Sequence, residues 1–73
     1  MSVDNSFYRR LGKKIRQQRE KKKFSQEHLS LFCKIDRTYI ARIEEGKANP
    51  TVKILNKISR ALEIRLWQLL RGL

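Results

Sequence analysis

The chain has 73 residues, so it has room for a single domain with one small hydrophobic core. Lysine and arginine total 18 against 7 aspartate and glutamate residues, and the net charge of +11 indicates a polyanionic partner, either nucleic acid or an anionic membrane surface. One cysteine excludes an internal disulfide and a cysteine cluster for zinc, and neither a long apolar run nor a signal-peptide pattern is present.

The first part of the chain is predicted to be a flexible N-terminus, residues 1–6, followed by a basic helix over residues 7–22. The helix is predicted because apolar residues recur at helical spacing, namely Phe7 or Tyr8, Leu11 and Ile15. Although most charge runs are simply solvated surfaces, we interpret the basic residues of this helix as a mixture of phosphate contacts and general positive potential. Lys22 and Lys23 are the candidates for phosphate contacts.

Residues 25–45 are predicted to form a helix, a tight turn at Lys34 and Ile35, and a second helix that begins after Asp36. Ser25 and Asp36 are good N-cap residues because their side chains can accept a hydrogen bond from a first-turn N–H. Gly46 ends the second helix as a residue able to adopt positive φ. The expected inward side chains are Leu29, Phe32, Ile40 and Ile43, with Ser30 and Cys33 as small residues that allow close approach.

The solvent side of this second helix carries residues suited to reading base edges. Arg37, Thr38, Tyr39 and Arg42 lie at its start and on its outer face. An arginine fork can bond guanine O6 and N7 together, and threonine can bond a base or touch a thymine methyl group. A short helix with such residues at its N-terminal end fits the DNA major groove, which is the helix-turn-helix arrangement.

The stretch over residues 25–46 resembles the DNA-binding domain of the phage-repressor/Cro (XRE) family of helix-turn-helix regulators, and the similarity continues to about Leu70. The pattern positions are Gln26, Glu27, Leu29, Ile35, Asp36, Ile40, Ile43, Glu44 and Gly46. The run from Asp36 to Ile40 resembles one subgroup, the controller proteins of restriction–modification operons. The resemblance implies an all-α, compact four- to five-helix bundle, with one helix-turn-helix domain over residues 7–71 and a dimerisation region at about residues 62–71.

The resemblance also implies roles for residues outside the reading face. Arg19 is expected to pair with Glu44 and so tie the first helix to the recognition helix, although two exposed charges remain the alternative. The start of the helix at Ser25 and Gln26 is expected to hold one phosphate. The loop after Gly46 is expected to hold another through Lys47 and Asn49.

The C-terminal third is predicted to contain two further helices. Thr51 caps the first, residues 52–62, whose apolar stripe is Ile54, Leu55, Ile58 and Leu62. The second runs from Leu66 to about Arg71. Its Trp67 is expected to be exposed and to form a subunit contact with Ile64 and Leu70, unless the ring lies on its own domain.

Three positions where the family often has glycine carry other residues here: Lys23, Lys34 and Glu63. Positive φ at such a residue costs about 1 kcal/mol relative to glycine. His28 is interpreted as solvent-facing or as a phosphate neighbour, and Cys33 as a small buried residue rather than a reactive thiol. We find no metal cluster, cofactor motif or catalytic constellation, so the sequence does not predict an enzyme.

The function implied by the residues and the resemblance is sequence-specific binding of double-stranded DNA as a homodimer, at a palindromic or pseudo-palindromic operator. A controller-type transcription regulator of this kind would be cytoplasmic, bacterial or phage-encoded and associated with the nucleoid, with RNA polymerase as a further partner. The alternatives of the same fold are a phage-type repressor and an antitoxin. The alternatives of another class are a non-specific basic nucleic-acid-binding protein and a membrane-surface binder.

Overall fold

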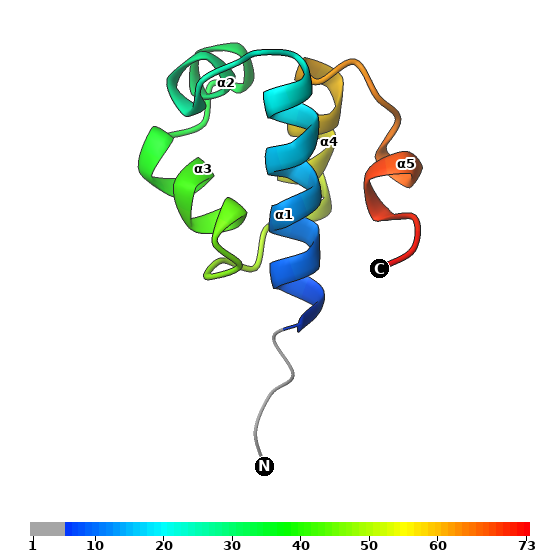
Figure 1. The fold of residues 1–73 in the computed structure, drawn as a ribbon. Helices are drawn as coiled ribbons and strands as arrows, with labels where there is room; N and C mark the ends of the chain where they lie inside the picture. The colour runs from blue at the N-terminus through cyan, green and yellow to red at the C-terminus, as the bar shows by residue number, and fades with distance from the viewer. Residues whose placement is uncertain (1–5) are drawn as a thin grey trace.

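The computed structural model describes residues 6–73, which form five helices (Figure 1). They are α1 (Ser6–Lys21), α2 (Gln26–Cys33), α3 (Arg37–Glu44), α4 (Val52–Ala61) and α5 (Leu66–Leu70). No strand occurs among the described residues, and the predicted all-α class with a helix-turn-helix is confirmed. The predicted flexible segment falls mostly on residues 1–5, which lie outside the described part, while Ser6 is already helical.

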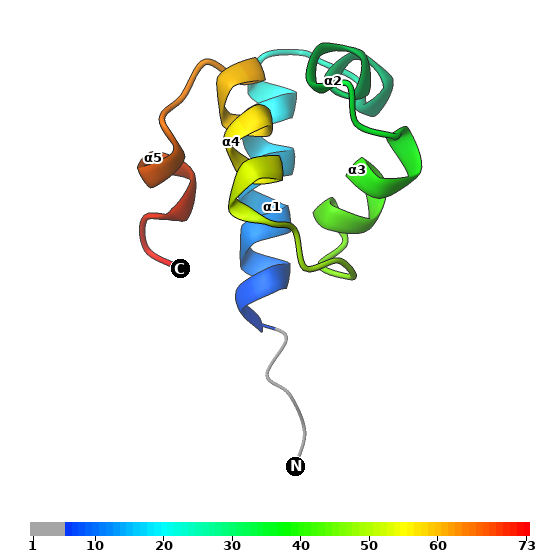
Figure 2. The ribbon, with the colours of Figure 1, turned by 180° about the vertical axis from the view of Figure 1, so that it is seen from behind.

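Helix α1 lies in the middle of the domain, where it overlaps α4 in both views, and it packs against α3 on one side and α5 on the other (Figures 1 and 2). Helix α2 packs against both α3 and α4, and α5 packs against α1 and α4. One core joins all five helices: Leu11, Ile15, Leu29, Cys33, Ile35, Ile40, Ile43, Leu55, Ile58, Leu62 and Leu69. The helix predicted to read DNA, α3, and the helix predicted to mediate dimerisation, α5, therefore lie on opposite sides of the domain.

The three predicted N-caps are present. The Ser25 hydroxyl accepts a hydrogen bond from the His28 N–H at 3.0 Å, Asp36 accepts from Thr38, and Thr51 accepts from Ile54. Exposed His28 completes the cap of α2, because its Nδ1 accepts from the Ser25 N–H at 3.3 Å. Glutamate or glutamine is usual at this third helical position, which is why the sequence alone did not assign the role to histidine.

The prediction that Phe32 faces inward is wrong. Its side chain is 59% exposed, and its ring packs edge-on against Phe24. Leu29 and Cys33, four residues apart, form the stripe of α2 that enters the core, so Phe32 falls at the edge of that stripe. At the start of α1, Tyr8 is half-buried, whereas Phe7 is exposed.

The three helix ends without glycine do adopt the left-handed conformation. The φ angles of Lys23, Lys34 and Glu63 are 61°, 56° and 59°. Each residue stands at the end of a helix, where positive φ reverses the chain and lets backbone N–H groups bond the last turn. Lys34, for example, donates its N–H to the Ser30 carbonyl at the end of α2.

Replacing Lys34 by glycine should therefore raise the free energy of unfolding by about 1 kcal/mol, because glycine adopts positive φ without a steric penalty. Urea unfolding followed by circular dichroism measures the change. Lys34→Ala is the matched control, since it removes the same side chain and retains the Cβ. If both variants gain equally, the charge rather than the backbone conformation is responsible.

Candidate nucleic-acid interface

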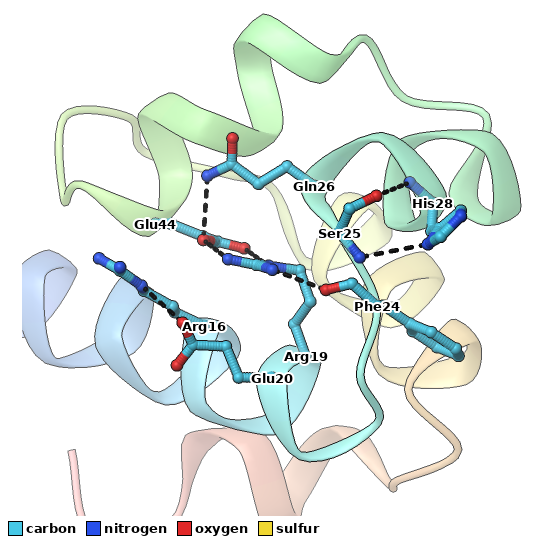
Figure 3. Close-up of polar contacts among 8 residues, drawn as sticks. All are labelled: Arg16, Arg19, Glu20, Phe24, Ser25, Gln26, His28 and Glu44. Carbon is cyan, nitrogen blue, oxygen red and sulfur yellow. Dashed lines mark hydrogen bonds and ion pairs between the residues drawn. The ribbon is translucent and has the colours of Figure 1, made fainter.

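A buried ion pair joins α1 to the recognition helix α3 (Figure 3). The guanidinium of Arg19 donates to both carboxylate oxygens of Glu44, at 2.7 Å and 3.0 Å, and its third bond reaches the Phe24 carbonyl at 2.7 Å. Both residues are 8% exposed, so the pair lies inside the fold rather than on its surface. The hydrogen bonds to Glu44 raise the pKa of Arg19, which keeps the guanidinium charged. The predicted pair is thus present, and exposed charges are excluded.

The start of α2 is tied to the same ion pair by Gln26, whose Nε2 donates to a Glu44 oxygen at 3.1 Å (Figure 3). This contact was not foreseen, because Gln26 was expected to help hold a phosphate at the start of the helix. The first-turn backbone N–H groups of Gln26 and Glu27 have no intrahelical acceptor, as at every helix start. They remain suited to a phosphate, with Gln26 fixing the position of the helix end.

The predicted base-reading residues on the outer face of α3 differ in how far they are exposed to solvent. Arg37 and Thr38 are exposed in its first turn, whereas Tyr39 is half-buried and packs against the core. Tyr39 therefore has less surface to offer a base than its neighbours do.

Arg42 is exposed and already has a partner. Its Nη2 donates to the Lys47 carbonyl at 2.9 Å, and the Lys47 N–H donates back to the Arg42 carbonyl at 2.9 Å. Arg42 thus orders the loop after α3 and has the other donors of its fork left for a base. Nothing in the residue types signalled this bond, because it depends on the turn at Gly46, where φ is 74°.

The remaining phosphate candidates divide between two places. Lys47 and Asn49 are exposed in the loop after α3, where Lys47 lies 3.7 Å from the Glu45 carboxylate. Lys22 instead pairs with Glu63 at 2.7 Å, at the corner between α4 and α5, and this contact lowers the pKa of Glu63. Lys23 lies in the turn after α1 and is exposed. Lys22 is therefore directed away from the recognition helix.

The residues predicted for the subunit contact differ in exposure. Ile64 and Leu70 are half-buried against the core of their own domain, whereas Trp67 is 56% exposed. The Arg71 guanidinium lies 6.0 Å from the centre of the Trp67 ring, at the outer limit of a cation–π contact. Trp67 thus offers the largest apolar surface on α5.

No group of metal-ligating residues occurs in the described part of the chain. Within the same residues, no helix is both long and apolar enough to cross a membrane. The Cys33 thiol is buried, and this burial raises its pKa to about 11. Cys33 is therefore a core residue, as predicted.

Residues 15–66 match the helix-turn-helix family, and the chain belongs to that family. It is 43% identical over 60 residues to the control protein C.BamHI of Bacillus amyloliquefaciens, covering 81% of this chain and 74% of that protein. It is 43% identical over 61 residues to the control protein C.MunI of a Mycoplasma species, covering 82% of each. The structure matches the restriction–modification controller protein C.AhdI of Aeromonas hydrophila with a TM-score of 0.86 at 30% identity, over 88% of this chain and 97% of that one.

These matches confirm the predicted family and a function in transcription regulation through DNA binding. The family is one of regulatory proteins rather than enzymes. The candidate DNA-facing parts of the fold are the outer face of α3, the start of α2 and the loop after Gly46.

Proposed function

We propose that the protein is a controller-type regulator that binds, as a homodimer, a palindromic or pseudo-palindromic operator in double-stranded DNA. The observation that carries this is the exposed start of α3, where Arg37 and Thr38 stand on a helix fixed by the buried Arg19–Glu44 pair. The relatives named as control proteins support the regulatory role. The protein would act in the cytoplasm, at the nucleoid of a bacterial cell.

The docking that fits this geometry places α3 in the major groove. Arg37 and Thr38 then meet base edges, and each good arginine–guanine pair supplies about 1–3 kcal/mol of discrimination. Arg42, farther along α3, reads another base. Its bond to the Lys47 carbonyl holds the loop after α3 in place beside the DNA backbone. The N–H groups at the start of α2 hold a phosphate on the other side of the groove. Preorganised contacts of this kind lose little entropy on binding.

The dimer would form through α5, with Trp67 as the main apolar contact and Ile64 and Leu70 beside it. Because α5 and α3 lie on opposite sides of α1, this contact leaves both recognition helices available (Figures 1 and 2). Two copies of α3 would enter successive major grooves with half-site centres about 34–36 Å apart. Because the dimer would form only above a threshold concentration, operator occupancy would rise steeply with the concentration of the protein.

Selection of bound duplexes from a randomised library at two salt concentrations tests the proposal. A repeated, two-fold half-site is the expected result. Arg37→Ala should then relax one base position in each half-site at a cost of about 1–3 kcal/mol, whereas Lys47→Ala should weaken all sequences alike and reduce the salt dependence. If no sequence is enriched and binding disappears at moderate salt, the protein is a non-specific basic binder.

Transcription from a reconstituted promoter separates the remaining roles. Repression requires only that the dimer occupies the operator, whereas activation requires a contact with RNA polymerase as well. A controller-type regulator should act on operators beside its own gene and an endonuclease gene. A protein that instead requires a bound toxin, or acts only on phage promoters, would be an antitoxin or a phage-type repressor of the same fold.

A further inference from the structure

A hollow of about 330 Å³ is lined by residues of α1 and of the α5 region. Helix α5 lies on the side of α1 away from α3 (Figures 1 and 2). The lining of the hollow contains three cations, two amides and one apolar side chain: Lys14, Lys21, Arg71, Gln18, Gln68 and Ile64. It contains no carboxylate. Its volume is at the lower end of the range for small-molecule sites, which is about 300–1,000 Å³.

The cations of this hollow are not neutralised by the fold. Glu63, the carboxylate at the nearby α4–α5 corner, is paired with Lys22 at 2.7 Å. Among residues 6–73, no ion pair is formed by Lys14, Lys21 or Arg71. Like charges held together without a counter-charge raise the local potential and favour the binding of an anion.

Two contacts give the hollow a defined shape. The Lys14 ammonium donates to the Arg71 carbonyl and so joins α1 to the end of α5. The Gln68 Oε1 accepts from the Arg65 N–H at 2.8 Å, which fixes the side chain of Gln68 at the start of the helix. The cations therefore approach from two different helices, as a clamp on a small multivalent anion requires.

We propose that this hollow binds a small phosphate-bearing anion, and that the bound anion promotes dimerisation through α5. The second part rests on the proposed homodimer. Arg65 and Arg71 stand at the two ends of α5, so a contact between two copies of α5 would bring like charges together and oppose association. An anion bridging Lys21 on α1 and Arg71 on α5 neutralises part of that charge and holds α5 in its docked position.

Calorimetric titration of the full chain with inorganic pyrophosphate, at constant ionic strength, tests the site. One saturable site per chain is expected. Lys21→Gln and Arg71→Gln should each weaken binding about tenfold, the value of one charge-assisted hydrogen bond. Lys53→Gln, which removes an exposed cation of α4 outside the hollow, is the charge-matched control and should leave binding unchanged. Equal weakening in all three variants, or no saturation, overturns the proposal.

Sedimentation of the same proteins tests the link to dimerisation. Pyrophosphate should tighten the dimer of the unaltered chain and of Lys53→Gln, whereas Lys21→Gln should need about ten times more pyrophosphate for the same effect. A parallel titration with ATP distinguishes a nucleotide from free phosphate as the source of the anion. If the calorimetry shows the site but the chain stays monomeric at every concentration, the proposed dimer has failed while the anion site stands. If the dissociation constant of the dimer is the same with and without the bound anion, the proposed link between anion binding and dimerisation is wrong.

Discussion

Replacing Glu44 by alanine should lower the free energy of unfolding by about 3–5 kcal/mol, because it leaves the charge of Arg19 buried without a partner. The Arg19 side chain would lose two of its three hydrogen bonds, and the Gln26 amide would lose its acceptor. A domain of this size is held by roughly 5–15 kcal/mol, so the variant would lose a large share of its stability. Urea unfolding at a fixed protein concentration measures the loss, since dimerisation also contributes to stability.

Two further variants test whether the loss of stability comes from the burial of an unpaired charge rather than from the loss of an ion pair as such. Glu20→Ala removes the exposed pair with Arg16, whose side chains are 62% and 56% accessible, and should change stability by less than about 0.5 kcal/mol. The double variant Arg19→Met with Glu44→Leu replaces the buried pair by apolar side chains and should be more stable than Glu44→Ala alone. Equal losses from Glu44→Ala and Glu20→Ala would mean that the Arg19–Glu44 pair is hydrated in solution.

The sequence predicted those features of this fold that depend on local chemistry. The caps Ser25, Asp36 and Thr51 were predictable because a hydroxyl or carboxylate before an apolar repeat satisfies the first-turn N–H groups. Positive φ at Lys34 was expected through the resemblance, because the family often has glycine at this helix end. These features involve neighbours within a few residues, so their geometry is determined by the chain itself.

Contacts between segments far apart in the chain were harder to predict from the sequence. The Arg19–Glu44 pair was predictable only through resemblance to a family, since its members are 25 residues apart. The bond from Arg42 to the Lys47 carbonyl and that from Gln26 to Glu44 depend on how α3 lies against α2 and its loop. The inward position expected for Phe32 was wrong, because the buried stripe of α2 is formed by Leu29 and Cys33 and Phe32 falls at its edge. The candidate base-reading residues stay predictions until DNA binding is measured.

Gly12 is the feature of α1 that composition and spacing did not single out. It is buried where α1 crosses the end of the recognition helix. A Cβ atom added there would lie 2.3 Å from the Ile43 carbonyl oxygen and 2.6 Å from that of Glu44. Both atoms belong to the backbone, so neither can rotate away, and the two helices would have to separate.

Gly12→Ala therefore brings two opposed effects into competition. Alanine in a helix interior is favoured over glycine by about 0.5–1 kcal/mol, so propensity alone predicts a gain in stability. Overpacking against rigid backbone costs about 3 kcal/mol, so the net result should be a loss of about 2 kcal/mol or more in urea unfolding. Gln17→Ala, at an exposed position of the same helix, should be nearly neutral. Because Arg19 lies two turns beyond Gly12, separating the helices also lengthens its bonds to Glu44. A gain from Gly12→Ala would show that α1 and α3 move apart easily, and the recognition helix would then not be rigidly held.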